Sequence, residues 1–128
     1  MPSGADIVDE YLPQMLERCA NCDGRILVAE VNEEVAGFAT ILARVHSDEI
    51  VDGNIEYGLV SDIVIASEYR RQGIGRKLLE AAELYARANN VRWLRIGVLA
   101  ENNSADDLYG SMGFKKIYVE REKDLTER

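Results

Sequence analysis

The chain is organised around one stretch, Ile63-Val-Ile-Ala-Ser-Glu-Tyr-Arg-Arg-Gln-Gly-Ile-Gly-Arg-Lys-Leu-Leu79. An apolar strand runs into a basic turn with two glycines, and the turn opens directly into an amphipathic helix. The first N–H groups of a helix lack intrahelical partners and carry a partial positive charge, so this turn predicts an anion site. A phosphate or pyrophosphate is the expected ligand.

Composition bounds the fold and the partners. With 128 residues, of which 47% are hydrophobic, the chain predicts a single domain over residues 1–128. The net charge of -8 argues against a nucleic-acid partner. It would attract a cationic substrate, although a surplus of acidic residues more often serves solubility alone. The cations gather instead in the turn and the helix start, which fits one bound anion; they are Arg70, Arg71, Arg76 and Lys77.

Several other classes of protein are disfavoured. No apolar run is long enough to cross a membrane and no signal peptide is recognisable, so a cytoplasmic protein without a membrane partner is expected. Cys19 and Cys22 form a lone C-x-x-C, and His46 is the only histidine, so we expect two reduced thiols and no metal site.

The remaining pattern predicts a mixed α/β fold. A helix is expected over residues 7–19, with Pro13 kinking or splitting it, followed by antiparallel strands at 25–31 and 35–45. Asp52-Gly53 indicates a hairpin turn into a third strand over 54–66.

After the basic turn, Ile74, Leu78, Ala81, Ala82 and Tyr85 form the inner face of a helix. A strand at 92–99 should run parallel to the strand before this helix. Ser104 is the expected cap of a short helix that ends at Gly113, and Phe114–Val119 is the last expected strand.

Two nucleotide motifs do not fit the basic turn. A dinucleotide fingerprint, G-x-G-x-x-G, would need a third glycine where Leu78 stands. A Walker motif would need G-x-x-x-x-G-K-[ST], and neither Gly73 nor Gly75 belongs to such a run. A general phosphate or nucleotide binder stays open at this point.

The turn Arg70-Arg-Gln-Gly-Ile-Gly75 matches R/Q-x-x-G-x-G/A, the motif by which the chain resembles the GNAT superfamily of acyl-CoA-dependent N-acyltransferases. Asp62 to Arg70 looks like that family's central strand and entry turn. Asn102 to Phe114 looks like its N-x-x-A-x-x-x-Y-x-x-x-G-F segment. The resemblance covers roughly residues 25–119.

The resemblance implies a mixed sheet with antiparallel N-terminal strands, splayed parallel central strands and helices on both faces. The family's first strand has no counterpart here, which leaves a sheet edge that we expect to serve a homodimer. The implied reaction is transfer of an acetyl group from acetyl-CoA to a primary amine, by direct attack in a ternary complex. A non-catalytic acyl-CoA-binding sensor or regulatory module is the alternative.

The resemblance also implies a cofactor site. Backbone N–H groups from Gln72 to Arg76 cradle the pyrophosphate, and the arginines supply charge. The backbone of the preceding strand binds the pantetheine arm and polarises the thioester carbonyl. Gly97 fits either a bulge near this arm or close packing. The expected cofactor-binding residues are Ile63, Val64, Ile65, Arg70, Arg71, Gln72, Gly73, Ile74, Gly75, Arg76 and Asn102.

Three residues are the candidates for acid and base. Tyr109 matches the family tyrosine that protonates the coenzyme A thiolate, although a tyrosine packed on a helix face explains its spacing too. Glu56 and Asp62 are the candidate bases. The resemblance equally allows water chains that lead from the central strand, and a solvated or hydrogen-bonded surface carboxylate explains either residue without chemistry. The strand period puts both carboxylates on one face, unless a bulge intervenes.

Overall fold

The computed structural model describes residues 4–47, 53 and 55–126, and for residues 4–11 the backbone alone. The chain forms two compact units, Met1–Gly97 and Val98–Arg128. The elements of the first unit are α1 (Gly4–Asn21), β1 (Gly24–Val31), β2 (Glu34–His46), β3 (Glu56–Ile65), the 3₁₀ turn η2 (Ser67–Tyr69), α2 (Ile74–Ala88) and β4 (Leu94–Ile96).

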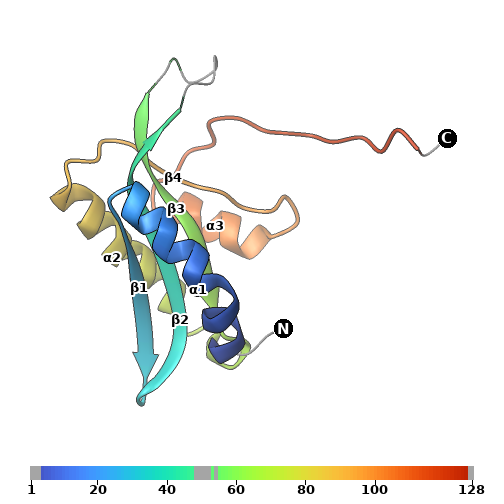
Figure 1. Ribbon diagram of the computed structural model, residues 1–128. Helices are drawn as coiled ribbons and strands as arrows, with labels where there is room; N and C mark the ends of the chain where they lie inside the picture. The colour runs from blue at the N-terminus through green and yellow to red at the C-terminus, as the bar shows by residue number, and fades with distance from the viewer. Residues whose placement is uncertain (1–3, 48–52, 54, 127–128) are drawn as a thin grey trace. The chain divides into compact units, whose positions relative to one another are not determined.

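The sheet has the order β1-β2-β3-β4 (Figure 1). β1 pairs with β2, and β2 with β3, in antiparallel fashion. β4 follows the α2 crossover and runs parallel to β3. The predicted mixed sheet is therefore confirmed, although β4 is shorter than the strand expected over residues 92–99.

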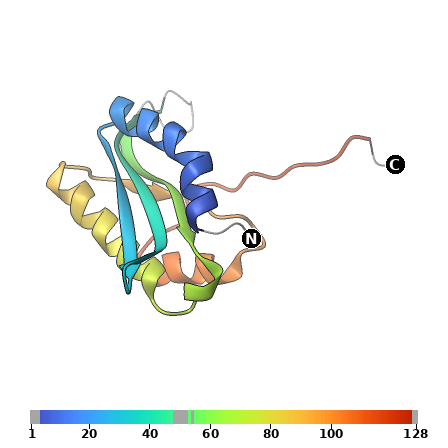
Figure 2. The ribbon, with the colours of Figure 1, turned by 60° about the horizontal axis from the view of Figure 1, so that its bottom comes forward.

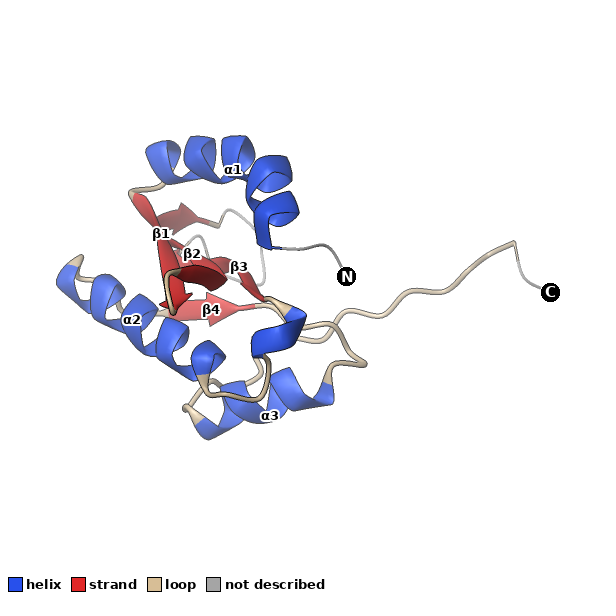
Figure 3. Ribbon diagram, turned by 90° about the horizontal axis from the view of Figure 1, so that it is seen from below, coloured by secondary structure: helices blue, strands red, loops and turns tan. Residues whose placement is uncertain are grey.

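α1 lies along one face of this sheet (Figure 2). Met15 of α1 and Phe38 of β2 are buried together, and Leu12, Ile26 and Val64 pack against them. The helix is continuous across Pro13, so the predicted split does not occur, but its ribbon bends (Figure 3). A proline inside a helix removes one backbone hydrogen bond, which accounts for a bend.

α2 covers the opposite face of the sheet (Figure 3). Its buried residues are Ile74, Leu78, Leu79, Ala82 and Ala86. Three of these belong to the predicted inner face, and Leu79 and Ala86 widen it. Helices on both faces were predicted and are confirmed, and the core therefore lies in two layers, one on each side of β2.

The turn between β1 and β2 consists of Asn32 and Glu33, with φ of 50° and 68°. Positive φ at both central residues is what a type I′ hairpin turn requires. The turn lies between the two expected strands, over Asn32 and Glu33, and Glu34 already belongs to β2. In the other predicted hairpin turn, Asp52 and the strand start Asn54 lie outside the described residues. Gly53 itself has φ of 62°.

In the second unit, α3 (Asn103–Ser111) is capped by Asn102, whose side-chain oxygen accepts a hydrogen bond from the N–H of Ala105 at 3.1 Å. The predicted cap, Ser104, is wrong. Ser104 lies inside the helix and donates its hydroxyl to the Asn102 side chain at 3.4 Å. Asparagine two residues earlier already satisfies the third N–H of the helix, which is the role of an N-cap.

The predicted strand at Phe114–Val119 is also wrong, because these residues belong to none of the described strands. Ile117, Tyr118 and Val119 are 60%, 63% and 72% exposed. Strand-forming residues need a neighbouring strand to pair with, and the local pattern does not supply one. None of the helices in the described parts of the chain is long and apolar enough to cross a membrane.

Candidate functional site

The turn between β3 and α2 leaves the first N–H groups of α2 without a capping side chain. Gly73 caps α2 with φ of 79° and ψ of 9°, and no side chain takes the capping role. The first backbone bond of the helix runs from the N–H of Lys77 to the carbonyl of Gly73 at 3.2 Å, so three helical N–H groups precede it. Arg71 also has positive φ, 64°. Alternation of left- and right-handed backbone at a helix start forms a concavity that binds anions.

Side-chain hydrogen bonds fix this turn to β2, to β3 and to the η2 turn. Arg70 donates its Nε–H to the carbonyl of Ile65 at 3.3 Å, and the Gln72 amide donates to the carbonyl of Glu68 at 3.4 Å. The Tyr69 hydroxyl donates to a Glu34 carboxylate oxygen at 2.5 Å. Arg70 therefore has a structural contact besides the anion-binding role predicted for it.

β3 and β4 separate beside this turn. Their parallel pairing covers Gly58 with Leu94, Leu59 with Arg95, and Val60 with Ile96, and it goes no further. β3 continues beyond this point to Ile65, paired only with β2 among the described strands. The predicted splaying of the two central strands is thus present, and it leaves the edge of β3 open over its last five residues.

The ladder with β2 shows which backbone groups point into this opening. The N–H of Ala66 donates to the carbonyl of Ala36 at 2.8 Å, and hydrogen-bonded pairs alternate along an antiparallel ladder. Val64 therefore turns its backbone groups toward β2, and Ile63 and Ile65 turn theirs away from it. The two residues with outward groups are the ones expected to bind the pantetheine arm, whereas the N–H of Val64 is used within the sheet.

A β-bulge separates the two candidate bases. Val60 pairs with Ile41 and Asp62 pairs with Thr40, so Ser61 is an extra residue on β3. Thr40 and Ile41 are neighbours on β2 and point to opposite faces of the sheet. Their partners, Asp62 and Val60, therefore also point to opposite faces. Glu56, four residues from Val60, shares its face. The carboxylates of Glu56 and Asp62 consequently lie on opposite faces of the sheet. The strand period predicted a shared face only in the absence of a bulge, and the bulge is present.

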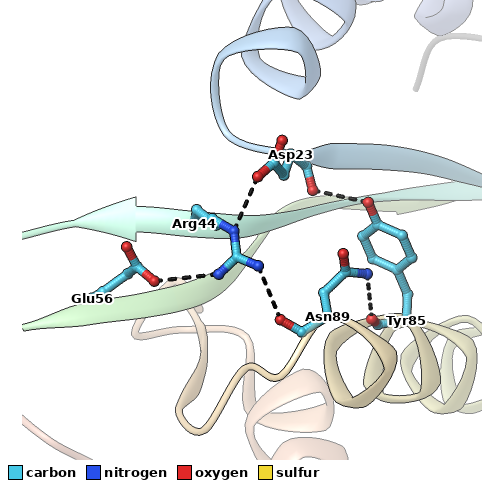
Figure 4. Close-up of polar contacts among 5 residues, drawn as sticks. All are labelled: Asp23, Arg44, Glu56, Tyr85 and Asn89. Carbon is cyan, nitrogen blue, oxygen red and sulfur yellow. Dashed lines mark hydrogen bonds and ion pairs between the residues drawn. The ribbon is translucent and has the colours of Figure 1, made fainter.

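Glu56 takes part in a polar cluster on the α2 face (Figure 4). Arg44 of β2 donates to Glu56 at 3.4 Å, to the Asp23 carboxylate at 3.0 Å and to the carbonyl of Asn89 at 3.2 Å. The Tyr85 hydroxyl donates to the backbone carbonyl of Asp23 at 2.9 Å. This cluster links the end of α2 to β2 and to the turn before β1, and it gives Glu56 a structural role.

Asp62 lies on the other face, beneath α1. Its Oδ2 is 3.6 Å from an Arg18 guanidinium nitrogen and accepts a hydrogen bond from the Ser61 hydroxyl at 2.9 Å. Burial raises the pKa of the nearby Cys19 thiol, and the charges of Cys22 and Asp62 raise it further. Both cysteines are free thiols, as predicted.

Tyr109 is a buried residue of α3 in the second unit. The way in which α3 ends explains the Y-x-x-x-G-F spacing. The N–H of Phe114 bonds the carbonyl of Tyr109 at 3.0 Å, and the N–H of Gly113 bonds that of Gly110 at 3.1 Å. With Gly113 at φ of 93°, this is a Schellman motif. The rings of Tyr109 and Phe114 pack edge to face, with their centroids 6.1 Å apart. Burial raises the pKa of Tyr109, which keeps its hydroxyl protonated.

Sequence reasoning missed Arg18, Ser61 and Arg44. Arg18 follows Met15 by three residues, and this helical spacing places it on the sheet-facing side of α1. That signal was available. The bulge at Ser61 and the partners of Arg44 depend on strand register, which no local pattern reveals.

A splayed pair of parallel strands beside a glycine-bearing helix start defines the class of acyl-CoA-dependent acyltransferases that the sequence resembles. The model of the acetyltransferase (GNAT) family matches residues 3–114, so the chain belongs to the GNAT family.

Related sequences are N-acetyltransferases by name. The chain is 30% identical over 111 residues to an N-alpha-acetyltransferase from Sulfurisphaera tokodaii, covering 83% of this chain and 65% of that protein. It is 35% identical over 68 residues to the uncharacterized N-acetyltransferase YobR from Bacillus subtilis, covering 53% and 26%. The chain thus spans less than two thirds of the length of these curated relatives.

Solved structures share the fold at low identity. Aminoglycoside N-acetyltransferase AAC(6')-Iy in complex with CoA superposes with a TM-score of 0.68 at 13% identity, covering 93% of each chain. A transcriptional regulator from Bacillus halodurans C-125 gives 0.71 at 18% identity, covering 91% of this chain and 76% of that one.

Proposed function

We propose that this chain is an N-acetyltransferase domain over residues 1–128 that transfers an acetyl group from acetyl-CoA to a primary amine by direct attack in a ternary complex. The observation that carries the proposal is the opening between β3 and β4 beside the uncapped start of α2. A pyrophosphate at the helix start and a pantetheine arm along the open strand edge would occupy neighbouring places, as coenzyme A requires.

Three groups of residues bind the donor in this proposal. The N–H groups from Gln72 to Arg76 hold the pyrophosphate, with charge from the exposed Arg71 and Arg76. The outward backbone groups of Ile63 and Ile65 bind the pantetheine arm like an added strand. The N–H of Ile63, rather than that of Val64, polarises the thioester carbonyl, because Val64 pairs with β2.

The chemistry follows from the needs of aminolysis. The ammonium group of the acceptor first loses a proton to the Asp62 carboxylate or to water, and its nitrogen then forms a bond to the thioester carbon. As the C–S bond breaks, the electron pair leaves with sulfur, and Tyr109 donates its proton to the thiolate. The nitrogen loses its second proton to solvent, and the Tyr109 phenolate takes up a proton from solvent. The products are an N-acetyl amide and coenzyme A.

Of the two carboxylates, Asp62 is a better candidate than Glu56 for the group that binds the acceptor amine. It lies within the unpaired part of β3, beside the proposed thioester. Glu56 lies six residues away, about 20 Å along an extended strand, and bonds Arg44. We therefore assign Asp62 to the amine and Glu56 to the structural cluster.

The acceptor is proposed as an amine of a cationic small molecule or of a protein. The net charge of -8 supports either. So do the names of two relatives, one an N-alpha-acetyltransferase and one an aminoglycoside N-acetyltransferase. Participation of Asn102 in cofactor binding, a homodimer and a cytoplasmic location stay predictions.

The proposal is tested in two assays. Calorimetry compares coenzyme A with ATP, and we expect coenzyme A to bind more tightly. Release of coenzyme A thiol from acetyl-CoA is then followed with butylamine, 1,4-diaminobutane, a lysine peptide, an N-terminal peptide and an aminoglycoside. Tight ATP binding with weak coenzyme A binding contradicts the donor assignment. Coenzyme A binding without turnover of any amine favours the sensor module.

Tyr109→Phe tests the acid. Phenylalanine keeps the edge-to-face contact and the burial, so the fold and coenzyme A affinity should be retained. We expect kcat to fall by about 10²- to 10⁴-fold. Because burial raises the pKa of Tyr109 above its ordinary value of 10.0, the alkaline loss of kcat in the wild type should lie above pH 10.0. An unchanged kcat in Tyr109→Phe excludes the assigned role.

A further inference from the structure

The place where an acceptor amine can approach follows from the two faces of the sheet. α2, whose start holds the pyrophosphate in our proposal, covers one face, and α1 covers the other (Figure 3). A pantetheine arm that passes through the opening between β3 and β4 brings its acyl end toward the α1 face. Asp62 is the carboxylate of the open part of β3 that points to this face.

Arg18 holds this carboxylate only loosely. The nearest guanidinium nitrogen is 3.6 Å from Asp62 Oδ2, which is longer than a charge-assisted hydrogen bond. The two side chains are 51% and 32% exposed, so water screens their attraction. The hydroxyl of Ser61, in contrast, donates to the same oxygen at 2.9 Å and fixes the orientation of the carboxylate.

We propose that Arg18 takes the place of the acceptor's ammonium group beside Asp62, and that a protonated primary amine displaces it on binding. A small ammonium group can hydrogen-bond Asp62 directly at about 2.7–2.9 Å, which the guanidinium does not do in the resting arrangement. Arg18 is then a specificity residue: it keeps the carboxylate neutralised until an amine arrives. This inference rests on the proposed function of the site.

The bulge at Ser61 places the proposed displacement of Arg18 by an amine on the α1 face of the sheet. Without the extra residue Ser61, Asp62 would point toward α2, away from Arg18 and from the approaching amine. With it, the carboxylate lies under the last turn of α1, where Arg18 reaches it.

The test is calorimetric titration of 1,4-diaminobutane into the protein, with and without saturating coenzyme A. Arg18→Gln should tighten diamine binding about two- to fivefold, the range that an exposed ion pair allows. Arg18→Lys should stay near the wild type, and Asp62→Asn should weaken binding at least fivefold. Arg87→Gln is the matched control, because Arg87 also lies in the last turn of its helix and carries the same charge.

Salt and kinetics give a second readout. The difference between wild type and Arg18→Gln should shrink at high ionic strength, because salt screens exposed charges. With an amine that is turned over, Arg18→Gln should lower KM more than it changes kcat. A fall in kcat at constant KM would mean that Arg18 positions Asp62, and the exchange would be wrong.

Binding that is no tighter in Arg18→Gln than in Arg87→Gln, or no weaker in Asp62→Asn, also overturns the inference. These titrations do not depend on turnover. If no amine is acetylated, the proposed function fails, while the exchange at Asp62 is still decided by the diamine affinities.

Discussion

Substitution of Gly73 separates the stability of the turn from its capacity to bind a phosphate. Gly73 has φ of 79°, and a Cβ atom added there would meet no described atom within 4 Å. Alanine therefore fits sterically and is penalised only through its backbone conformation. Asparagine tolerates left-handed backbone and can also cap a helix, so it should restore most of the stability.

The expected change in the free energy of unfolding of Gly73→Ala is the difference between two opposing effects. Left-handed backbone costs about 1–2 kcal/mol for a residue with a Cβ. Alanine also reduces the entropy of the unfolded chain, which returns roughly 0.4–1 kcal/mol. Gly73→Ala should thus lower the free energy of unfolding by about 1 kcal/mol, or Tm by about 3–5 °C for a chain of this size. Gly73→Asn should remain within about 0.5 kcal/mol of the wild type.

Coenzyme A affinity should respond differently. The open space beside Gly73 is where we place the pyrophosphate, so any side chain there obstructs it. Both Gly73→Ala and Gly73→Asn should weaken coenzyme A binding by at least about tenfold, measured by calorimetry. Gly53→Ala is the control, because Gly53 has φ of 62° and an added Cβ would also meet no described atom within 4 Å, but Gly53 lies in the β2–β3 connection. Wild-type affinity in Gly73→Asn would refute the placement of the phosphate, and wild-type stability in Gly73→Ala would refute the backbone argument.

Two further predictions concern contacts that anchor the site. Arg44→Ala removes three polar contacts that are largely exposed, so urea unfolding should show a loss of about 1–2 kcal/mol, with coenzyme A affinity little changed. A loss of affinity without a loss of stability would contradict this structural role. The hydrogen bond to Glu34 raises the pKa of Tyr69, so this contact stabilises the fold below pH 10.0 and is lost as pH rises through the raised pKa. Tyr69→Phe should therefore flatten the alkaline decline in Tm, and an unchanged decline would exclude this bond as its cause.

Local sequence signals predicted the parts of the fold that local physics determines. Asn32 and Glu33 adopt the positive φ that a tight hairpin needs, and the apolar spacing of residues 74–86 gives the buried face of α2. The start of α2 was predictable because Gly73 and its basic neighbours occur together. Where a partner strand decides the outcome, the sequence misled: residues 114–119 have strand composition but no described neighbour to pair with.

The candidate site divides in the same way. The turn that we propose as the anion site is contiguous in sequence, so its residues could be identified together. The choice between Glu56 and Asp62 could not be made from residue type, since both are carboxylates on one strand. It depends on Ser61, which has no side-chain property that marks it as a bulge and is extra only with respect to Thr40 and Ile41 of β2. One residue in the hydrogen-bond ladder therefore places Asp62 with Arg18 on the α1 face and leaves Glu56 with Arg44. Our proposal that Asp62 binds the amine thus rests on backbone register.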